Sequence, residues 1–221
     1  MGIKKLKEKC VVVLSGGPDS STLAYWAKDQ GYDVSAITFN YGQISVKEIE
    51  YAKKIATELN ISQQIVDLSS LKDIFQGVTS LVDENLEMTP AFSQHIIVPF
   101  RNAIFLSVAV AYASSINSTR ILYGAQLSDA QNYPDCREEF YKSFEKTARL
   151  GTDTQIIIDA PFSDKSKSEV IKLGNNLGVP YGLTWSCYLN KESHCGKCES
   201  CRNRKNAFIE AGINDSTKYL I

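Results

Sequence analysis

Cys10-Val-Val-Val-Leu-Ser-Gly-Gly-Pro-Asp-Ser-Ser-Thr-Leu23 is the stretch of sequence that decides the fold. Residues 11–14 form an apolar, mostly β-branched run, which predicts a fully buried strand of a parallel sheet. The strand ends at the turn-forming residues 15–18, and residues 19–21 supply hydroxyl and carboxylate groups that we expect to cap a helix. A turn from a strand onto a helix N-terminus presents free backbone N–H groups. The stretch therefore predicts an anion site, for which phosphate is favoured over an ordinary βα turn.

The loop matches neither of two common phosphate motifs. It lacks the lysine of a Walker A loop and the glycine spacing of a dinucleotide fingerprint. Ser-Gly-Gly-x-Asp-Ser after a first strand instead resembles the PP-loop of the ATP pyrophosphatase superfamily, which splits ATP between its α and β phosphates. The resemblance implies that Asp19 and Ser20 are catalytic, that Asp19 orients the loop or helps to hold Mg²⁺, and that one run of residues contacts ATP. That run is Leu14, Ser15, Gly16, Gly17, Pro18, Asp19, Ser20, Ser21, Thr22, Leu23 and Ala24.

The composition is that of an ordinary soluble domain. The 221 residues are 43% hydrophobic and 22% charged, with a net charge of −1, so no global basic field indicates nucleic-acid binding. We expect no apolar run to reach membrane-spanning length, and we expect no signal peptide in residues 1–9. We therefore expect a cytoplasmic protein that acts on a small molecule and binds neither membrane nor nucleic acid directly.

Strand and helix patterns alternate along the first 180 residues. Strands are expected at 11–14, 32–39, 64–68, 121–123 and 155–158, and helices at 46–59, 103–113, 138–150 and 166–177. This alternation predicts an α/β fold with a doubly wound, five-stranded parallel sheet, of the adenine nucleotide alpha hydrolase-like type. Residues 69–99 are expected to be an irregular insertion: a lid, a dimer contact or a mobile connection. A soft boundary near 180 separates this ATP-binding domain, 1–180, from a C-terminal segment and helix, 181–221.

Four of the six cysteines lie within fifteen residues of one another in the C-terminal segment. Cys187, Cys195, Cys198 and Cys201 have spacers of seven, two and two residues, which suit tetrahedral coordination of one ion. Zinc is favoured over an iron–sulfur cluster, and four protein ligands predict a structural role. His194, beside a ligand, is expected to lie near the site or to be exposed rather than to bind the ion.

Several further motifs are more specific than the loop. They are Thr38-Phe-Asn-Tyr-Gly-Gln43, Val98-Pro-Phe-Arg-Asn-Ala-Ile-Phe-Leu-Ser107, Tyr133-Pro-Asp-Cys-Arg137, Ser166-Lys-Ser-Glu169 and the cysteine cluster. In this order, and over nearly the whole chain, they resemble the 7-cyano-7-deazaguanine synthase (QueC) family. The resemblance implies ATP-dependent conversion of 7-carboxy-7-deazaguanine and ammonia into the nitrile, in queuosine or archaeosine biosynthesis. The steps would be adenylation of the carboxylate, amide formation and dehydration.

The same resemblance implies roles for single residues. Lys167 would supply the catalytic cation that the loop lacks. The expected substrate-binding residues are Tyr41, Gln43, Arg101, Asn102, Asp129, Tyr133, Asp135 and Arg137. Arg101 can pair with a carboxylate or phosphate, Asp129 and Asp135 can accept from ring N–H groups, and Arg137 is a loop anchor or phosphate contact. Cys136 is expected to be a buried thiol. A homodimer is expected.

The chain departs from the commonest bacterial pattern at two turns. Phe100 replaces a glycine, where it would reshape the base pocket, and Asn132 is one of two residues that replace Ser-Gly, where asparagine can adopt left-handed geometry. The alternatives are a related enzyme that passes the activated carboxylate to another amine such as a protein group, a tRNA-modifying ATP pyrophosphatase, and a zinc-stabilised nucleotide-binding module.

Overall fold

The computed structural model describes residues 7–221 and contains one five-stranded parallel sheet. Residues 1–6, part of the stretch in which no signal peptide is expected, lie outside the described residues. The strand order is β3-β2-β1-β4-β5, so the predicted doubly wound topology is confirmed. The strands are β1 (Lys9–Val13), β2 (Asp33–Asn40), β3 (Ser62–Asp67), β4 (Arg120–Leu122) and β5 (Ile157–Asp159).

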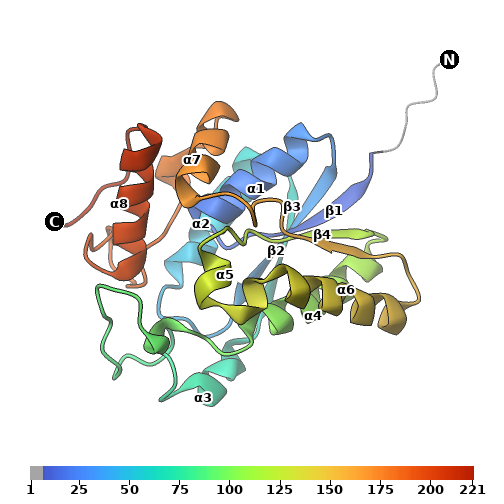
Figure 1. Cartoon of the computed structure of the whole chain (residues 1–221), viewed down its shortest axis with the longest axis horizontal. Coiled ribbons are helices and arrows are strands. Elements are labelled where there is room, and N and C mark those ends of the chain that lie inside the picture. The colour runs from blue at the N-terminus through green and yellow to red at the C-terminus, as the bar shows by residue number, and fades with distance from the viewer. Residues whose placement is uncertain (1–6) are drawn as a thin grey trace.

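Both faces of the sheet are covered by helices (Figure 1). The helices on one face are α1 (Pro18–Asp29), α2 (Lys47–Glu58) and α7 (Lys167–Asn176), and those on the other are α4 (Arg101–Ser115) and α6 (Glu138–Thr152). Alternate residues of β1 explain this arrangement, because Val12 packs against α1 while Val11 packs against α4. A strand buried on both faces needs a continuous apolar run, which is the pattern that predicted it.

The start of α1 differs from the expectation that residues 19–21 cap it. Gly17 is the N-cap residue, and Pro18 occupies the first helical position, where its fixed φ and missing N–H cost nothing. The Ser20 hydroxyl turns back to Ser15 instead. At α7, Ser166 is the N-cap residue and forms a reciprocal capping box with Glu169.

The excursion at residues 69–99 is an ordered layer over the edge of the sheet. It contains α3 (Lys72–Phe75) and short 3₁₀ turns at Ser69–Leu71 and Gln94–Ile96. Phe75, Leu81 and Val82 are buried together with Tyr41 and Val98. The carbonyl of His95 accepts hydrogen bonds from the Ser80 amide and from the hydroxyls of Thr79 and Ser80. These contacts favour a packed, ordered insertion over a mobile connection.

One stretch, residues 94–115, is long and apolar enough to cross a membrane by length and composition alone. This differs from our expectation that no apolar run reaches that length. Within it, α4 packs on the sheet, and its side chains Leu106, Ala109 and Ala113 are buried in the main core with Val11 and Ile121. The stretch is therefore the core helix of an α/β enzyme fold.

The C-terminal segment packs against the sheet domain through α8 (Glu199–Ala211), which lies beside α7 (Figure 1). Its anchor is Arg204, a fully buried arginine. The guanidinium pairs with both carboxylate oxygens of Asp215, at 3.0 and 3.1 Å, and donates to Thr184 Oγ1 at 2.7 Å and to the Tyr181 carbonyl at 2.9 Å. A paired and fully hydrogen-bonded arginine ties the chain end to α8 and to residues 181–184.

Candidate functional site

A cavity of about 310 Å³ opens where β1, β2 and β4 end. This is the edge at which ligands bind in doubly wound sheets. Its wall brings together Leu14, Ser15, Gly17, Pro18, Asp19, Ser20, Tyr41, Gln43, Arg101, Asn102, Asp129, Tyr133, Asp135 and Lys167, all expected from the sequence. The cavity also collects residues that the sequence did not single out, among them Glu48, Tyr123 and Trp185.

The loop between β1 and α1 is held in an open conformation by its own hydroxyls. Ser20 Oγ lies 3.0 Å from Ser15 Oγ and accepts from the Ser15 amide at 3.1 Å. Gly16 has φ +83°, and an added Cβ would lie 2.3 Å from the Glu48 carbonyl oxygen. Only glycine fits there, because α2 begins directly against the loop.

Lys167 reaches across from the start of α7 to the start of α1. Its Nζ lies 2.5 Å from Asp19 Oδ2, which brings together two residues 148 positions apart. Burial disfavours the charged ammonium and so lowers the pKa of Lys167. The negative charges of Asp19, Asp129 and Glu199 have a larger, opposite effect, so the pKa is raised. Lys167 is therefore a permanent cation beside the loop, and we call Ser15, Gly17, Asp19, Ser20 and Lys167 the loop end of the cavity.

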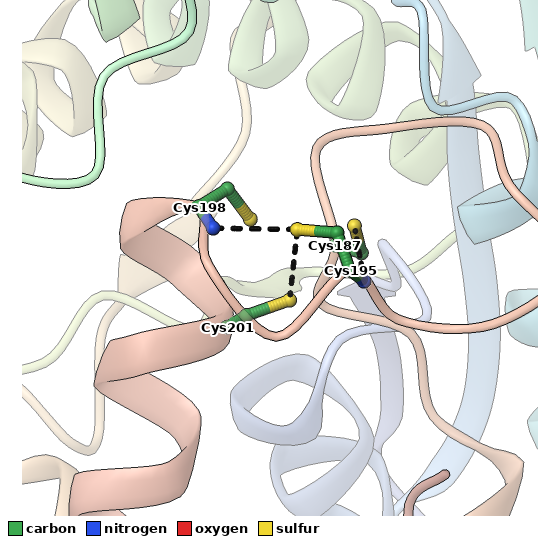
Figure 2. A group of neighbouring side chains, drawn as sticks. All are labelled: Cys187, Cys195, Cys198 and Cys201. Carbon is green, nitrogen blue, oxygen red and sulfur yellow. Dashed lines mark hydrogen bonds between the residues drawn. The ribbon is translucent and has the colours of Figure 1, made fainter. Parts of the chain in front are cut away.

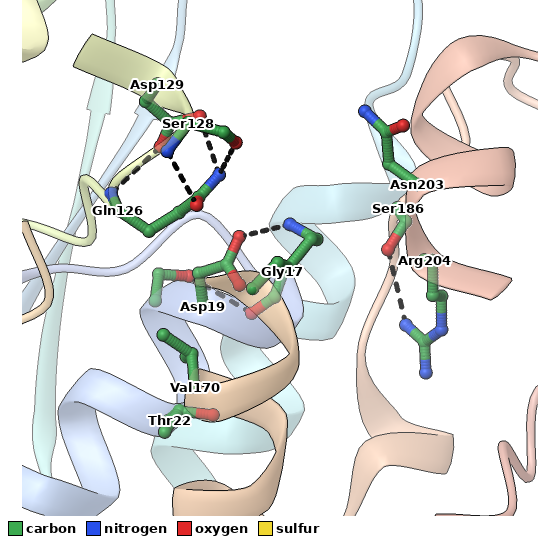
Figure 3. Close-up of polar contacts among 12 residues, drawn as sticks. Gly17, Asp19, Thr22, Gln126, Ser128, Asp129, Val170, Ser186, Asn203 and Arg204 are labelled. Carbon is green, nitrogen blue, oxygen red and sulfur yellow. Dashed lines mark hydrogen bonds and ion pairs between the residues drawn. The ribbon is translucent and has the colours of Figure 1, made fainter. Parts of the chain in front are cut away.

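Asp129 lies opposite Asp19 on a loop that is braced internally (Figure 3). Both of its carboxylate oxygens accept hydrogen bonds from Gln126, one from the amide and one from the side chain. Burial raises the pKa of Asp129 despite these bonds and the charge of Lys167. Asp19 Oδ1, by contrast, is buried and has no hydrogen-bond partner within residues 7–221.

The other end of the cavity is built around Arg101. Its guanidinium donates to Tyr41 Oη at 3.2 Å and lies over the rings of Tyr41 and Phe105. The charged or ionisable groups around Arg101 include Tyr41, Glu48 and Asp135, whereas those around Lys167 include Asp19, Asp129 and Glu199. We call Tyr41, Gln43, Glu48, Arg101, Asn102 and Asp135 the arginine end.

Asn102 forms hydrogen bonds within the protein, so it is less available to bind a ligand. Its amide N–H donates to Asp135 Oδ2 at 3.0 Å, and its Nδ2 lies 3.2 Å from Cys136 Sγ. Cys136 is buried, as expected, and burial raises the pKa of its thiol to about 12. These bonds fix the loop that carries Asp135 against the first turn of α4.

Glu48 is the residue at this end that the sequence analysis missed. It is in the first turn of α2, and its Oε1 accepts from Gln43 Nε2 at 2.7 Å. Burial raises the pKa of Glu48 to about 7, against the lowering effects of the Arg101 charge and the Gln43 hydrogen bond. An acidic residue just after the Tyr-Gly-Gln loop was the available signal, but exposed acids are common in first helical turns.

Some expected contacts lie away from the cavity. Those that do not line it are Gly16, Ser21, Thr22, Leu23, Ala24 and Arg137. Thr22 is fully buried and lies 3.0 Å from the Tyr181 hydroxyl, while Arg137 is exposed and donates to the Ala130 carbonyl at 3.1 Å. Arg137 is therefore a loop anchor, one of the two roles considered for it.

The structure also shows the effect of the two residues, Phe100 and Asn132, that depart from the commonest bacterial pattern. Phe100 has φ +57°, and its side chain is 67% exposed, lies edge-on to Phe140 and does not line the cavity. It therefore does not reshape the pocket. Asn132 is the last residue of α5 (Asp129–Asn132) and has no positive φ, so the expected left-handed turn is wrong there.

Cys187, Cys195, Cys198 and Cys201 converge from the loop before α8 and from its first turn (Figure 2). All four are buried, and their sulfur atoms lie within 4.8 Å of one another. The sulfurs of Cys195 and Cys201 are 3.9 Å apart, close to the roughly 3.8 Å that two ligands of a tetrahedral zinc ion span. Backbone amides donate to the sulfurs of Cys187 and Cys195, as is usual around metal thiolates. The cluster fits a metal ion.

His194 is buried rather than exposed and is not one of these ligands. Its Nε2 accepts from the Ser186 amide at 3.0 Å, and its ring packs on Trp185. Burial and the nearby charge of Arg204 lower the pKa of His194 to about 4. The histidine is therefore a neutral packing residue beneath the cysteine cluster.

The cysteine segment also forms part of the cavity wall, through Trp185, Ser186, Tyr188 and Ser200. The Trp185 amide donates to the Gly16 carbonyl at 2.8 Å, and the Tyr188 hydroxyl donates to Glu199 Oε2 at 2.8 Å. The hydrogen bond from Trp185 to Gly16 holds the cysteine segment directly against the loop between β1 and α1. A change in the cysteine cluster can therefore reach the cavity.

Comparison with known proteins agrees with this architecture. A sequence model described as "Queuosine biosynthesis protein QueC" matches residues 9–212. Proteins named 7-cyano-7-deazaguanine synthase are 45% identical in Methanospirillum hungatei and 43% in Oceanobacillus iheyensis, each covering 96% of this chain and 99% of the relative. An NMN synthetase from Francisella tularensis has a similar fold, with a TM-score of 0.55, 20% identity, and coverage of 95% of this chain and 79% of the other. On its sequence, over nearly its full length, this chain belongs to the QueC family.

Proposed function

We propose that this protein is a 7-cyano-7-deazaguanine synthase. It would use ATP to activate the carboxylate of 7-carboxy-7-deazaguanine, join it to ammonia and dehydrate the resulting amide to the nitrile. Relatives of that name that align over 96% of the chain support this activity, which makes the protein a carbon–nitrogen ligase. A carboxylate is a poor electrophile, and an acyl adenylate supplies the leaving group that amide formation needs.

The observation that carries the proposal is that one cavity contains both the loop end and the arginine end, which suit different ligand groups. The loop end presents the Ser15 and Ser20 hydroxyls, the Gly17 amide and the Lys167 cation, which suit pyrophosphate. The arginine end presents a guanidinium on aromatic rings, which suits a planar heterocycle that carries a carboxylate. Catalysis would come mainly from positioning and from stabilising charge on the phosphates.

Each metal has a candidate site in the chain. Asp19 Oδ1 is buried and has no hydrogen-bond partner within residues 7–221, which supports Asp19 as a residue that would hold Mg²⁺. Magnesium would neutralise phosphate charge there. Cys187, Cys195, Cys198 and Cys201 would hold one Zn²⁺ in a closed site that stabilises the segment without taking part in the reaction.

Three further expectations belong to the same proposal. Ammonia is the amine, the protein works in the cytoplasm without binding nucleic acid directly, and two copies form a homodimer. The exposed side chains of Ile74, Val78 and Phe92 in the 69–99 excursion support a contact between copies. Analytical ultracentrifugation tests the dimer, and a single species at the monomer mass would contradict it.

The activity is tested by incubating the protein with ATP, Mg²⁺, 7-carboxy-7-deazaguanine and ammonium. We expect AMP and pyrophosphate by chromatography, and the nitrile by mass spectrometry. A protein that releases no AMP is not an enzyme of this class. AMP with an amide or a protein adduct as the only product would contradict nitrile formation.

A further inference from the structure

The proposed reaction needs a proton acceptor near the carboxyl carbon, and the phosphate-binding groups do not supply one. When the amine nitrogen attacks the acyl adenylate, a C–N bond forms and the C–O bond to AMP breaks with its electron pair. The nitrogen must lose a proton for the neutral amide to form. Dehydration removes the two remaining protons from the same nitrogen. A group that accepts these protons must be able to lose and regain a proton near neutral pH. This inference rests on the proposed function.

Most ionisable groups in the cavity are poorly suited to this task. Burial holds the pKa values of Tyr41 and Cys136 at about 12, so both stay protonated at neutral pH. Lys167 and Arg101 have raised pKa values and stay charged. Lys167 also occupies one carboxylate oxygen of Asp19.

The remaining carboxylates differ in what their oxygens already bind. Both oxygens of Asp129 accept from Gln126, whereas Asp135 uses Oδ2 for the Asn102 amide and keeps Oδ1 without a hydrogen bond within residues 7–221. Glu48 uses Oε1 for Gln43, and its Oε2 accepts no hydrogen bond within residues 7–221. It lines the cavity at the arginine end, where the carboxylate of the substrate would pair.

Gln43 holds Glu48 in a fixed position. Gln43 is buried; its Nε2 donates to the Phe39 carbonyl at 3.2 Å as well as to Glu48, and its Oε1 accepts from the Tyr41 amide at 2.8 Å. Every polar group of this amide is therefore used, so it cannot rotate freely. The bond leaves Oε2 of Glu48 free to meet a ligand.

We propose that Glu48 is the catalytic base that accepts the proton of the attacking amine. As the amine nitrogen bonds to the carboxyl carbon, its proton passes to the Glu48 carboxylate, the C–O bond breaks, and AMP leaves with the electron pair. The products of this step are the amide, AMP and protonated Glu48, which then releases its proton to solvent through the open cavity.

The charges around Glu48 suit a base that works near neutral pH. Arg101 from α4 favours the ionised form, Tyr41 from the loop after β2 stays neutral, and Asp135 faces the same guanidinium from the other side. Burial opposes the charge and brings the pKa of Glu48 to about 7. A base of this strength is available in its ionised form near neutral pH and still accepts a proton readily.

The test separates activation of the carboxylate from attack by the amine. Glu48→Gln preserves the acceptor for Gln43 and removes only the titration, and Glu50→Gln, an exposed acid on the same helical turn, is the matched control. We expect Glu48→Gln to retain carboxylate-dependent exchange of pyrophosphate into ATP within about threefold, and to form amide and nitrile at least about 10²-fold more slowly. Glu50→Gln should match the wild type in both measurements.

Two further measurements distinguish a base from a structural residue. At a constant concentration of free ammonia, the wild-type rate of amide formation should fall as the pH drops through about 7, and Glu48→Gln should lack this fall. Hydroxylamine, which is uncharged at neutral pH, should restore transfer in Glu48→Gln as the hydroxamate. Normal amide formation in Glu48→Gln, or equal loss of exchange and transfer, would overturn the role of Glu48. If the wild type shows no exchange, the proposed function itself fails.

Discussion

The two ends of the cavity are built in different ways. The loop end takes all but one of its residues from a single run, 15–20, and adds only Lys167 from elsewhere. The arginine end takes its residues from the loop after β2, the start of α2, the start of α4 and the turn before α6. A short contiguous motif can hold phosphate because backbone N–H groups do much of the binding. A heterocycle needs side chains from several directions, so that end depends on the tertiary fold.

The segment that carries the four cysteines forms part of the cavity wall, and the loss of a metal bound there should have the largest effect. We expect Cys198→Ser to release the metal, to lower the free energy of unfolding by about 4–5 kcal/mol or more, and to weaken binding at both ends. Without the ion, thiolates would repel one another, and Trp185 would lose its support on the loop. Metal analysis, thermal unfolding and ATP titration measure these effects.

Cys10→Ala is the control for this variant, because Cys10 is buried beneath α1 and belongs to no metal cluster in the described chain. It should keep the metal. If Cys198→Ser kept normal ATP affinity after losing its metal, the loop end would be independent of the cysteine segment.

The next largest effect should come from the cation of the loop end. Lys167→Met removes the charge beside Asp19 while leaving a side chain of similar length. We expect kcat/KM for ATP to fall about 10³-fold, since one donor to developing charge in a protected site is worth about this much. Steady-state kinetics measure the fall, and the metal content should stay normal.

Lys165→Met provides the matched control, because Lys165 pairs only with the exposed Asp164 and does not line the cavity. It should retain wild-type kinetics. An active Lys167→Met variant would mean that the backbone of the loop suffices to hold the pyrophosphate, and the contrast between the two ends would become sharper still.

At the arginine end, the geometry of a planar group should matter more than its charge. Arg101→Lys keeps the positive charge but loses the planar guanidinium with its paired N–H donors. It also loses the contact with the Tyr41 and Phe105 rings. We expect kcat/KM for the carboxylate substrate to fall about 10²-fold. The KM for ATP should change less than about threefold. Equal losses for both substrates would show that the two ends do not act separately.

The sequence predicted the loop end more completely than the arginine end, for a physical reason. Ser15, Asp19 and Ser20 are neighbours in one motif after a buried strand, so local rules suffice. Glu48 lies at the cavity only because Gly16 lets α2 begin against the loop and because Gln43 orients the carboxylate. Neither condition is visible in a pattern of helical spacing.

The buried Arg204 shows the same limit in the C-terminal segment. Its neighbours along the chain, Arg202 and Lys205, are basic too, and the run resembles an exposed helical face. Burial follows from Asp215, eleven residues later, which pairs with both branches of the guanidinium. Only the tertiary structure, in which residue Asp215 packs back against α8, identifies which of these basic residues is buried.

The smallest effect concerns the backbone at the edge of the arginine end. Phe100 holds the left-handed conformation of the N-cap of α4, one residue before Arg101, where glycine has no steric cost. Phe100→Gly and Phe100→Ala both remove the ring that meets Phe140, so their difference isolates the backbone term. We expect the glycine variant to be more stable than the alanine variant by about 1 kcal/mol in urea unfolding. Both should keep the wild-type KM for the carboxylate, because the ring lies outside the cavity; a raised KM in both variants would mean that the Phe100 ring acts on Arg101 through the start of α4.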